Sequence, residues 1–175
     1  KGIQKVVGAY AIKVVTSVPV PTIIVQKKNF PEHGYKKLLL PIDSTVENKQ
    51  TLPYAIEIAK DFNSEIHLIL APETDKEKIE DLKFNKEYTE KLLRSKNIKY
   101  SILETDPGEV DYEQQVLKYS SKIKADLIII MTRQRSGLKD IFVGPFEEHI
   151  INNPDQIAVM CVNPSEKNFT YEYIK

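Results

Sequence analysis

The chain has 175 residues, of which 41% are hydrophobic and 29% charged, and its 25 Lys and Arg residues balance its 25 Asp and Glu residues. This composition predicts a globular protein with one main domain and an additional segment. Zero net charge argues against a nucleic acid partner, because that partner calls for a basic face. The longest apolar run, which ends at Met131, is too short to cross a membrane. The first residues do not show the charged-then-apolar pattern of a signal segment, and Cys161 is the single cysteine, so we expect the chain in the reducing cytoplasm.

The first residues predict one helix and one strand but offer them no partner strands. The strand is the apolar run at Ile23, Ile24 and Val25. A linker, residues 28–35, separates this segment from the rest of the chain.

Strands and helices alternate from residue 36 onward. Apolar runs predict strands at residues 36–43, 64–73, 98–105, 125–132 and 156–163. Apolar residues at helical spacing predict helices at residues 47–62, 75–97, 112–124 and 145–152. Pro53 suits the first turn of its helix. This alternation predicts an α/β fold, an open five-stranded and mainly parallel sheet with helices on both faces.

The N-terminal segment repeats the pattern of the last helix and strand. Gly8 aligns with Gly144, and residues 23–25 then fall on Val159, Met160 and Cys161. The simplest interpretation is that residues 1–27 are the final helix and strand of a first domain. Residues 36–164 would then be a complete second domain, and residues 165–175 a tail. The alternative is an ordinary N-terminal helix and strand.

An Asp after the first strand and a glycine loop after the fourth give the sequence a family resemblance. "LLLPIDST", residues 38–45, resembles the first strand of the universal stress protein family, and residues 125–162 resemble its last third. The resemblance covers residues 36–164, and residues 1–26 resemble the end of a preceding tandem copy. It implies a Rossmann-like fold of the adenine-nucleotide-binding type and a role in the stress response without enzymatic activity.

The loop after the fourth strand departs from the family pattern. Relatives that bind ATP carry Gly-x-x-Gly, nine residues, then Gly and Ser or Thr. Here Met131 and Gln134 take the first two positions, Gly144 is kept, and Pro145 replaces the hydroxyl residue. Proline removes a hydroxyl and a backbone N–H, and the two side chains stand where glycines let the backbone approach phosphate. We therefore expect a degenerate site without tight ATP binding and without a cofactor.

Asp43 lies at the carboxyl end of a predicted parallel strand, where ligands of α/β sheets bind. The resemblance implies that Asp43 contacts ribose and base and that the backbone at Ala71 meets adenine. The alternative is that Asp43 only caps the loop after its strand. The candidate nucleotide site comprises Pro41, Ile42, Asp43, Ala71, Met131, Thr132, Arg133, Gln134, Gly144, Pro145 and Phe146.

Arg133 and Arg135 offer a replacement for the lost backbone donors, because arginine binds phosphate through a fork of donors. They are otherwise solvated loop residues. Glu147 and Glu148, in the first turn of the next helix, satisfy the helix dipole themselves and compete with a phosphate. The alternative function is therefore an ATP- or AMP-binding protein, with Mg, that acts as a nucleotide-dependent switch or slow ATPase.

The sequence carries no catalytic or metal-binding pattern. His33, His67 and His149 are scattered and lack the spacing of metal ligands. An α/β enzyme of another family would need a nucleophile or an acid/base pair at the strand ends, and only Asp43 is there. We therefore expect neither an enzyme nor a metal site.

The N-terminal helix and strand need a covering partner, because alone they cannot repay their ordering entropy. The resemblance implies association through last strands that pair antiparallel across a two-fold axis. The protein is thus expected to act by tandem-domain pairing or self-association into a dimer, with no nucleic acid or membrane partner. The pairing would cover an exposed sheet edge. We expect it to join Thr22, Ile23, Ile24, Val25 and Gln26 to Ala158, Val159, Met160, Cys161 and Val162, within the chain or between chains.

Overall fold

The computed structural model describes residues 9–27, 30–105, 108, 111–134 and 141–165. All five predicted strands of the main domain are present, as β2 (Lys37–Ile42), β3 (Glu65–Leu70), β4 (Tyr100–Glu104), β5 (Leu127–Met131) and β8 (Ala158–Val162). The N-terminal segment forms α1 (Ala9–Ser17) and β1 (Thr22–Ile24). The remaining helices are η1 (Glu47–Thr51), α2 (Leu52–Phe62), α3 (Lys76–Ser95), α4 (Tyr112–Ile123) and α5 (Pro145–Ile151).

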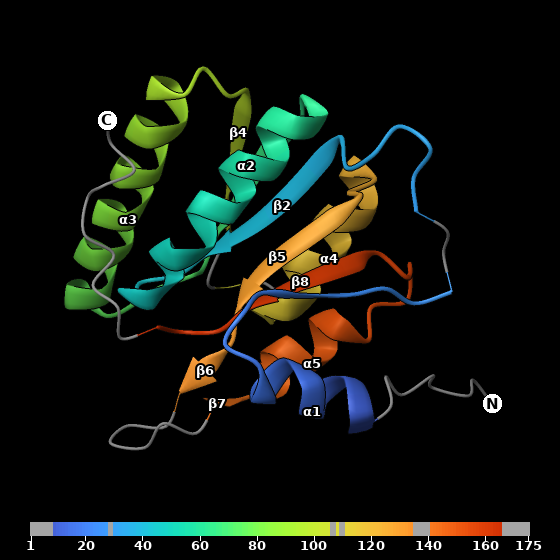
Figure 1. Ribbon diagram of the computed structural model, residues 1–175. Helices are drawn as coiled ribbons and strands as arrows, with labels where there is room; N and C mark the ends of the chain where they lie inside the picture. Colours follow the sequence, from blue (N-terminus) through green and yellow to red (C-terminus); the bar gives the residue numbers. More distant parts are fainter. Residues whose placement is uncertain (1–8, 28–29, 106–107, 109–110, 135–140, 166–175) are drawn as a thin grey trace.

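The strands form one sheet in the order β1-β8-β5-β2-β3-β4 (Figure 1). β2, β3, β4, β5 and β8 run parallel, and β1 runs antiparallel to β8 at the edge. The predicted α/β class with a mainly parallel sheet is confirmed. The sheet has six strands rather than five because β1 adds itself to the last one.

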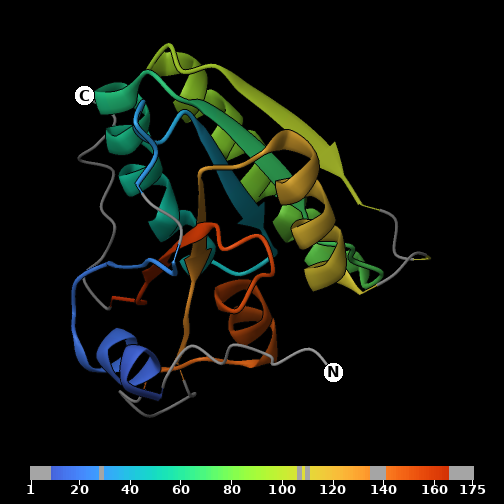
Figure 2. The same ribbon diagram turned by 90° about the vertical axis from the view of Figure 1, so that its right-hand side faces the viewer.

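Helices cover both faces of the sheet (Figures 1 and 2). α2 and α3 pack on one face, whereas α1, α4 and α5 pack on the other. Neighbouring side chains of a strand alternate between these layers, so that Leu38 and Leu40 belong to the first core and Leu39 to the second. The central strands β2, β5 and β8 are buried on both faces, which explains why their residues are mostly apolar.

The expected partner of β1 lies within the same chain. Thr22 is opposite Cys161, Ile23 opposite Met160 and Ile24 opposite Val159. The pairing stops there, since Val25 and Gln26 lie beyond β1. Ile24 is buried among the residues of α4 and α5, whereas Ile23 and Val25 point to the other face and stay 37% and 56% exposed.

The loop after β5 contains two strands that the sequence did not predict. β6 (Arg133–Gln134) and β7 (Ile141–Phe142) pair antiparallel. Arg135, which lies between them, and Gly8 are outside the described residues, as is most of the predicted tail. The predicted helix at residues 47–62 also begins as a 3-10 turn. Pro53 has no N–H to donate to the Lys49 carbonyl, which accepts from Leu52 instead.

Cys161 is a core residue of β8. Its side chain is 1% exposed, and burial, with a smaller contribution from Glu147, raises the pKa of the thiol to about 12. The thiol is therefore protonated and inert in the folded protein. Within the ranges that the structure describes, no helix is long and apolar enough to cross a membrane.

Candidate functional site

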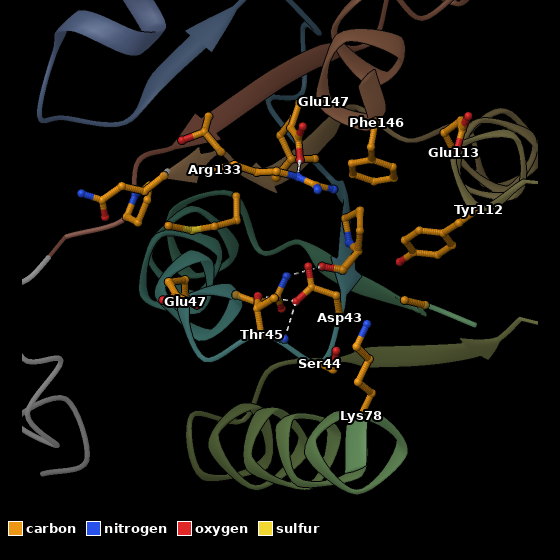
Figure 3. Close-up of a pocket in the computed structure, with 18 of the residues that line it drawn as sticks. Asp43, Ser44, Thr45, Glu47, Lys78, Tyr112, Glu113, Arg133, Phe146 and Glu147 are labelled. Atoms are coloured by element: carbon orange, nitrogen blue, oxygen red, sulfur yellow. Dashed lines mark hydrogen bonds and ion pairs between the residues drawn. The ribbon is translucent and has the colours of Figure 1, made fainter. Parts of the chain in front are cut away.

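The order of the strands reverses between β2 and β5. From β2 the chain continues to β3 and β4 on one side, whereas β5 and β8 lie on the other. In open α/β sheets, ligands bind outside the carboxyl ends of the strands at such a switch point. A cleft of about 660 Å³ lies there, between the loops that follow β2 and β5 (Figure 3).

The cleft brings together most of the candidate residues from distant parts of the sequence. Those that line it are Pro41, Asp43, Ala71, Met131, Thr132, Arg133, Gln134 and Phe146. The other three do not line it: Ile42 is buried in the sheet, Gly144 is buried against Glu147, and Pro145 is exposed. Pro145 therefore contributes neither a side chain nor an N–H to the cleft.

Asp43 begins the loop after β2 and is held by that loop. Its Oδ1 accepts a 2.8 Å hydrogen bond from the backbone N–H of Thr45 and another from the Thr45 hydroxyl. Asn85, a buried residue of α3, donates to the carbonyl oxygens of Asp43 and Thr45 at 2.8 and 2.9 Å. Asp43 thus caps its loop and also lines the cleft.

Burial raises the pKa of the Asp43 carboxyl above its usual value of 3.8. The hydrogen bonds from Thr45 and the positive charge of Arg133 act in the opposite direction, and the negative charge of Glu73 adds to the rise. The carboxyl is therefore a weaker acid than an exposed aspartate.

The loop after β3 forms the adjoining wall. The backbone N–H of Ala71 donates to the Ile42 carbonyl at 2.8 Å, which ties the ends of β3 and β2 together. Ser44 donates to Glu73 Oε1 at 2.8 Å across the same gap. The side chain of Asp75 caps α3 by accepting from the N–H groups of Glu77 and Lys78. This start of α3 brings the Lys78 side chain to the cleft (Figure 3).

An aromatic pair forms the wall near α4 and α5. Tyr112 opens α4 and Phe146 lies in the first turn of α5, and their rings stack with centroids 5.4 Å apart and planes at 7°. The Tyr112 hydroxyl donates to the Ile69 carbonyl at 2.8 Å. Burial raises the pKa of this phenol well above its usual value, so Tyr112 stays neutral.

A buried carboxylate closes the cleft beside the β5 loop. The Glu147 side chain is 3% exposed, and its Oε1 accepts from Arg133 Nε at 3.0 Å. Its Oε2 accepts from the backbone N–H of Gly144 at 2.8 Å. Gly144 permits this approach, because a Cβ there would lie 2.6 Å from Oε2. Figure 3 shows the guanidinium of Arg133 turned toward Glu147.

The described lining of the cleft carries more negative than positive charge. Its acidic residues are Asp43, Glu47, Glu73, Glu113 and Glu147, and its basic residues are Lys78 and Arg133. In the described part of the chain no three His, Cys, Asp or Glu side chains are grouped as metal ligands. His67 instead packs in β3, with its Nδ1 2.7 Å from the Ser101 hydroxyl.

Several lining residues were missed from the sequence. Glu73 and Tyr112 follow β3 and β4, in the connections that return over the edge where Asp43 lies. Their place after neighbouring strands was a usable signal, because the carboxyl ends of parallel strands meet at one edge. The sequence indicates a role for Glu147 only through its charge, and nothing in the sequence pattern pairs it with Arg133.

A mainly parallel sheet covered on both faces, with a cleft at its switch point, defines a Rossmann-like α/β protein. The universal stress protein family model matches residues 34–162 of the chain. The chain therefore belongs to the universal stress protein family.

Individual relatives agree with this assignment. A universal stress protein of Methanocaldococcus jannaschii is 29% identical over 149 residues, which are 78% of this chain and 87% of that protein. A universal stress protein structure from Archaeoglobus fulgidus has a TM-score of 0.71 at 18% identity and matches 90% of this chain. The chain spans 56% of that structure's length. An Arabidopsis thaliana protein of the family, solved with AMP bound, has a TM-score of 0.53 at 10% identity, over 80% of this chain and 99% of its own.

Proposed function

We propose that this chain is a universal stress protein module that does not bind ATP tightly and that acts by association rather than catalysis. The observation that supports this proposal is the Glu147 carboxylate, which accepts from both the Arg133 side chain and the Gly144 N–H. A phosphate at this wall would call on the same two donors. The Glu147 carboxylate therefore competes with such a phosphate for both the Arg133 side chain and the Gly144 N–H.

The changes in the loop after β5 support the same proposal. Met131 and Gln134 line the cleft in place of glycines, and Pro145 has no N–H to offer. Each lost partner costs a bound phosphate oxygen about 1 kcal/mol or more. We therefore do not favour the alternative, a nucleotide-dependent switch or slow ATPase that uses ATP or AMP with Mg, and we propose no resident cofactor.

The cleft nevertheless suits a small ligand. Asp43 stands at the switch point with a carboxylate that can accept from hydroxyl groups, beside a stacked aromatic wall. The relative with AMP bound shares this fold. Compounds built from a base and a ribose are therefore the class to test first.

The proposed association uses the outer edge of β1. β8 is already paired, since β1 runs along it within the chain. β1 ends the sheet, and Ile23 and Val25 beside it are exposed apolar residues. A second strand along this edge would pair its backbone groups and cover those side chains. We propose that this takes place in the cytoplasm.

Calorimetric titration of the purified protein with Mg-ATP and with AMP tests the nucleotide part, with Asp43→Ala as the site control. We expect no saturable heat with either compound at micromolar concentration. Saturable micromolar binding of Mg-ATP that disappears in Asp43→Ala would overturn the proposal. Sedimentation of the same protein tests association: a concentration-dependent dimer is expected, and a monomer at every concentration argues against it.

A further inference from the structure

The Glu147 side chain places a negative charge in the wall of the cleft where a phosphate would have to bind. It is 3% exposed and lies at the cleft, and each of its oxygens is engaged by one donor. A buried carboxylate is stable only with such partners. Arg133 is 56% exposed, so the ion pair is open to the cleft on the arginine side. A ligand that enters therefore meets an arginine whose charge is already balanced.

The remaining charges do not compensate. Besides Arg133, the described lining has one basic residue, Lys78. Besides Glu147, it has four acidic residues: Asp43, Glu47, Glu73 and Glu113. A phosphate in the cleft would be repelled by these carboxylates and would have to displace Glu147 from Arg133. Displacement would leave the buried carboxylate without partners, which is costly.

An uncharged ligand avoids both the repulsion by these carboxylates and the cost of displacing Glu147 from Arg133. Within the described part of the chain, both hydrogen bonds to the Asp43 side chain go to Oδ1, which leaves Oδ2 for ligand hydroxyl groups. Two adjacent hydroxyls, as on a ribose, are donors of the kind that a carboxylate accepts. The stacked rings of Tyr112 and Phe146 give the same cleft an apolar wall.

We propose that Glu147 is the specificity-determining residue of the cleft, and that it makes the cleft select an uncharged nucleoside over the corresponding nucleotide. Glu147 acts as a built-in anion that neutralises Arg133 and occupies the Gly144 N–H. This inference rests on the proposed function, to which it adds the ligand class and the residue that sets it.

Calorimetric titration of three proteins with adenosine and with AMP tests the proposal. The proteins are the wild type, Glu147→Gln, and Glu148→Gln as a matched control. Glu148 is the next residue of α5, is exposed and does not line the cleft. We expect the wild type and Glu148→Gln to bind adenosine at least about tenfold more tightly than AMP, and Glu147→Gln to gain about tenfold or more in AMP affinity relative to adenosine.

A double variant, Arg133→Gln with Glu147→Gln, tests whether Arg133 is the group that binds the AMP phosphate once the Glu147 charge is removed. It is expected to lose the gained AMP affinity, because Arg133 is then no longer available to the phosphate. Circular dichroism and thermal unfolding establish that each variant is folded. The wild-type ratio alone keeps the proposal testable if Glu147→Gln does not fold.

Three results would overturn the proposal. The first is a wild type that binds AMP more tightly than adenosine. The second is a folded Glu147→Gln variant whose ratio of the two affinities equals that of the wild type. The third is that neither the wild type nor Glu147→Gln binds adenosine or AMP. The failure of the proposed function is a different result, namely micromolar binding of Mg-ATP to the wild type. An unchanged ratio in Glu147→Gln alongside weak ATP binding overturns this inference and leaves the proposed function standing.

Discussion

The Asn163 side chain, just after β8, donates from Nδ2 to the carbonyl oxygen of Val15 in α1 over 2.6 Å. The same nitrogen donates to the Val18 carbonyl at 2.7 Å, and Oδ1 accepts from the Thr132 hydroxyl at 2.6 Å. One buried amide thus satisfies carbonyls at the end of α1 and links them to the end of β5. The N-terminal segment is fixed to the domain by polar contacts as well as by β1.

Asn163→Ala is expected to destabilise the protein by about 2 to 3 kcal/mol, because three hydrogen bonds are lost and buried carbonyls remain unpaired. Urea denaturation measures the loss, and limited proteolysis measures release of the N-terminal segment. Asn152→Ala is the control, since the Asn152 amide follows α5 and donates to the Glu148 carbonyl of that helix in an exposed hydrogen bond. Equal losses in the two variants would contradict the special role of Asn163.

Gly144→Ala is expected to break the contact between Gly144 and Glu147. Its Cβ would lie 2.6 Å from Glu147 Oε2 and 3.4 Å from Arg133 Nε, so the carboxylate must move. We expect a loss of about 1 to 2 kcal/mol in urea denaturation. Gly34→Ala should cost more, since Gly34 has φ +69° and its Cβ would fall 2.1 Å from the Phe62 ring. A Gly144→Ala variant as stable as the wild type would mean that the carboxylate shifts freely.

Local sequence patterns predict most of the fold. The apolar runs and the helical spacing predicted the strands and helices of the main domain except the 3-10 turn η1 and the short β6 and β7, because both core faces impose their own periodicity. The sequence does not predict the pairing of β6 with β7, because Arg133–Gln134 and Ile141–Phe142 are too short to show a strand pattern. The sequence does not predict the 3-10 turn at Glu47–Thr51, because Pro53 is equally compatible with the first turn of a continuous helix.

The candidate site was predictable where position along a strand decides it. Asp43 and Arg133 follow β2 and β5, and parallel strands place such residues at one edge. What each residue does there depends on its neighbours in space. The Glu147–Arg133 ion pair joins residues 14 apart, across a loop, and no periodicity relates them. The exposure of Ile23 and the burial of Ile24 likewise depend on which face of the sheet a helix covers.

Asp43 is expected to make stability depend on pH. Its folded-state pKa is raised above 3.8, so the protonated carboxyl contributes stability that is complete below about pH 3.8 and is lost as pH rises through the folded value. The amide side chain of the Asp43→Asn variant cannot ionise, so that variant escapes this loss. The Tm of Asp43→Asn minus that of the wild type should therefore increase from about pH 4 to about pH 7.

Thermal unfolding in buffers of constant ionic strength measures this difference. Asp81→Asn, which removes an exposed carboxylate of α3, controls for the change in net charge. A difference that stays flat or decreases with pH would contradict the raised pKa of Asp43.

Ile24→Asp is expected to detach β1 and α1 from the domain. Ile24 is 8% exposed and belongs to the core cluster that also contains Val15 and Val159. A carboxylate there is unpaired and buried, at a cost of about 3 kcal/mol or more. Ile23→Asp is the matched control, since Ile23 is the neighbouring residue on the more exposed face and should cost about 1 kcal/mol or less. Urea denaturation and proteolysis of the segment compare the two variants, and sedimentation is applied to Ile24→Asp alone, because Ile23 lies at the proposed association edge. If Ile24→Asp kept the wild-type Tm and size, β1 would contribute little to the sheet, and association through its edge would lose its basis.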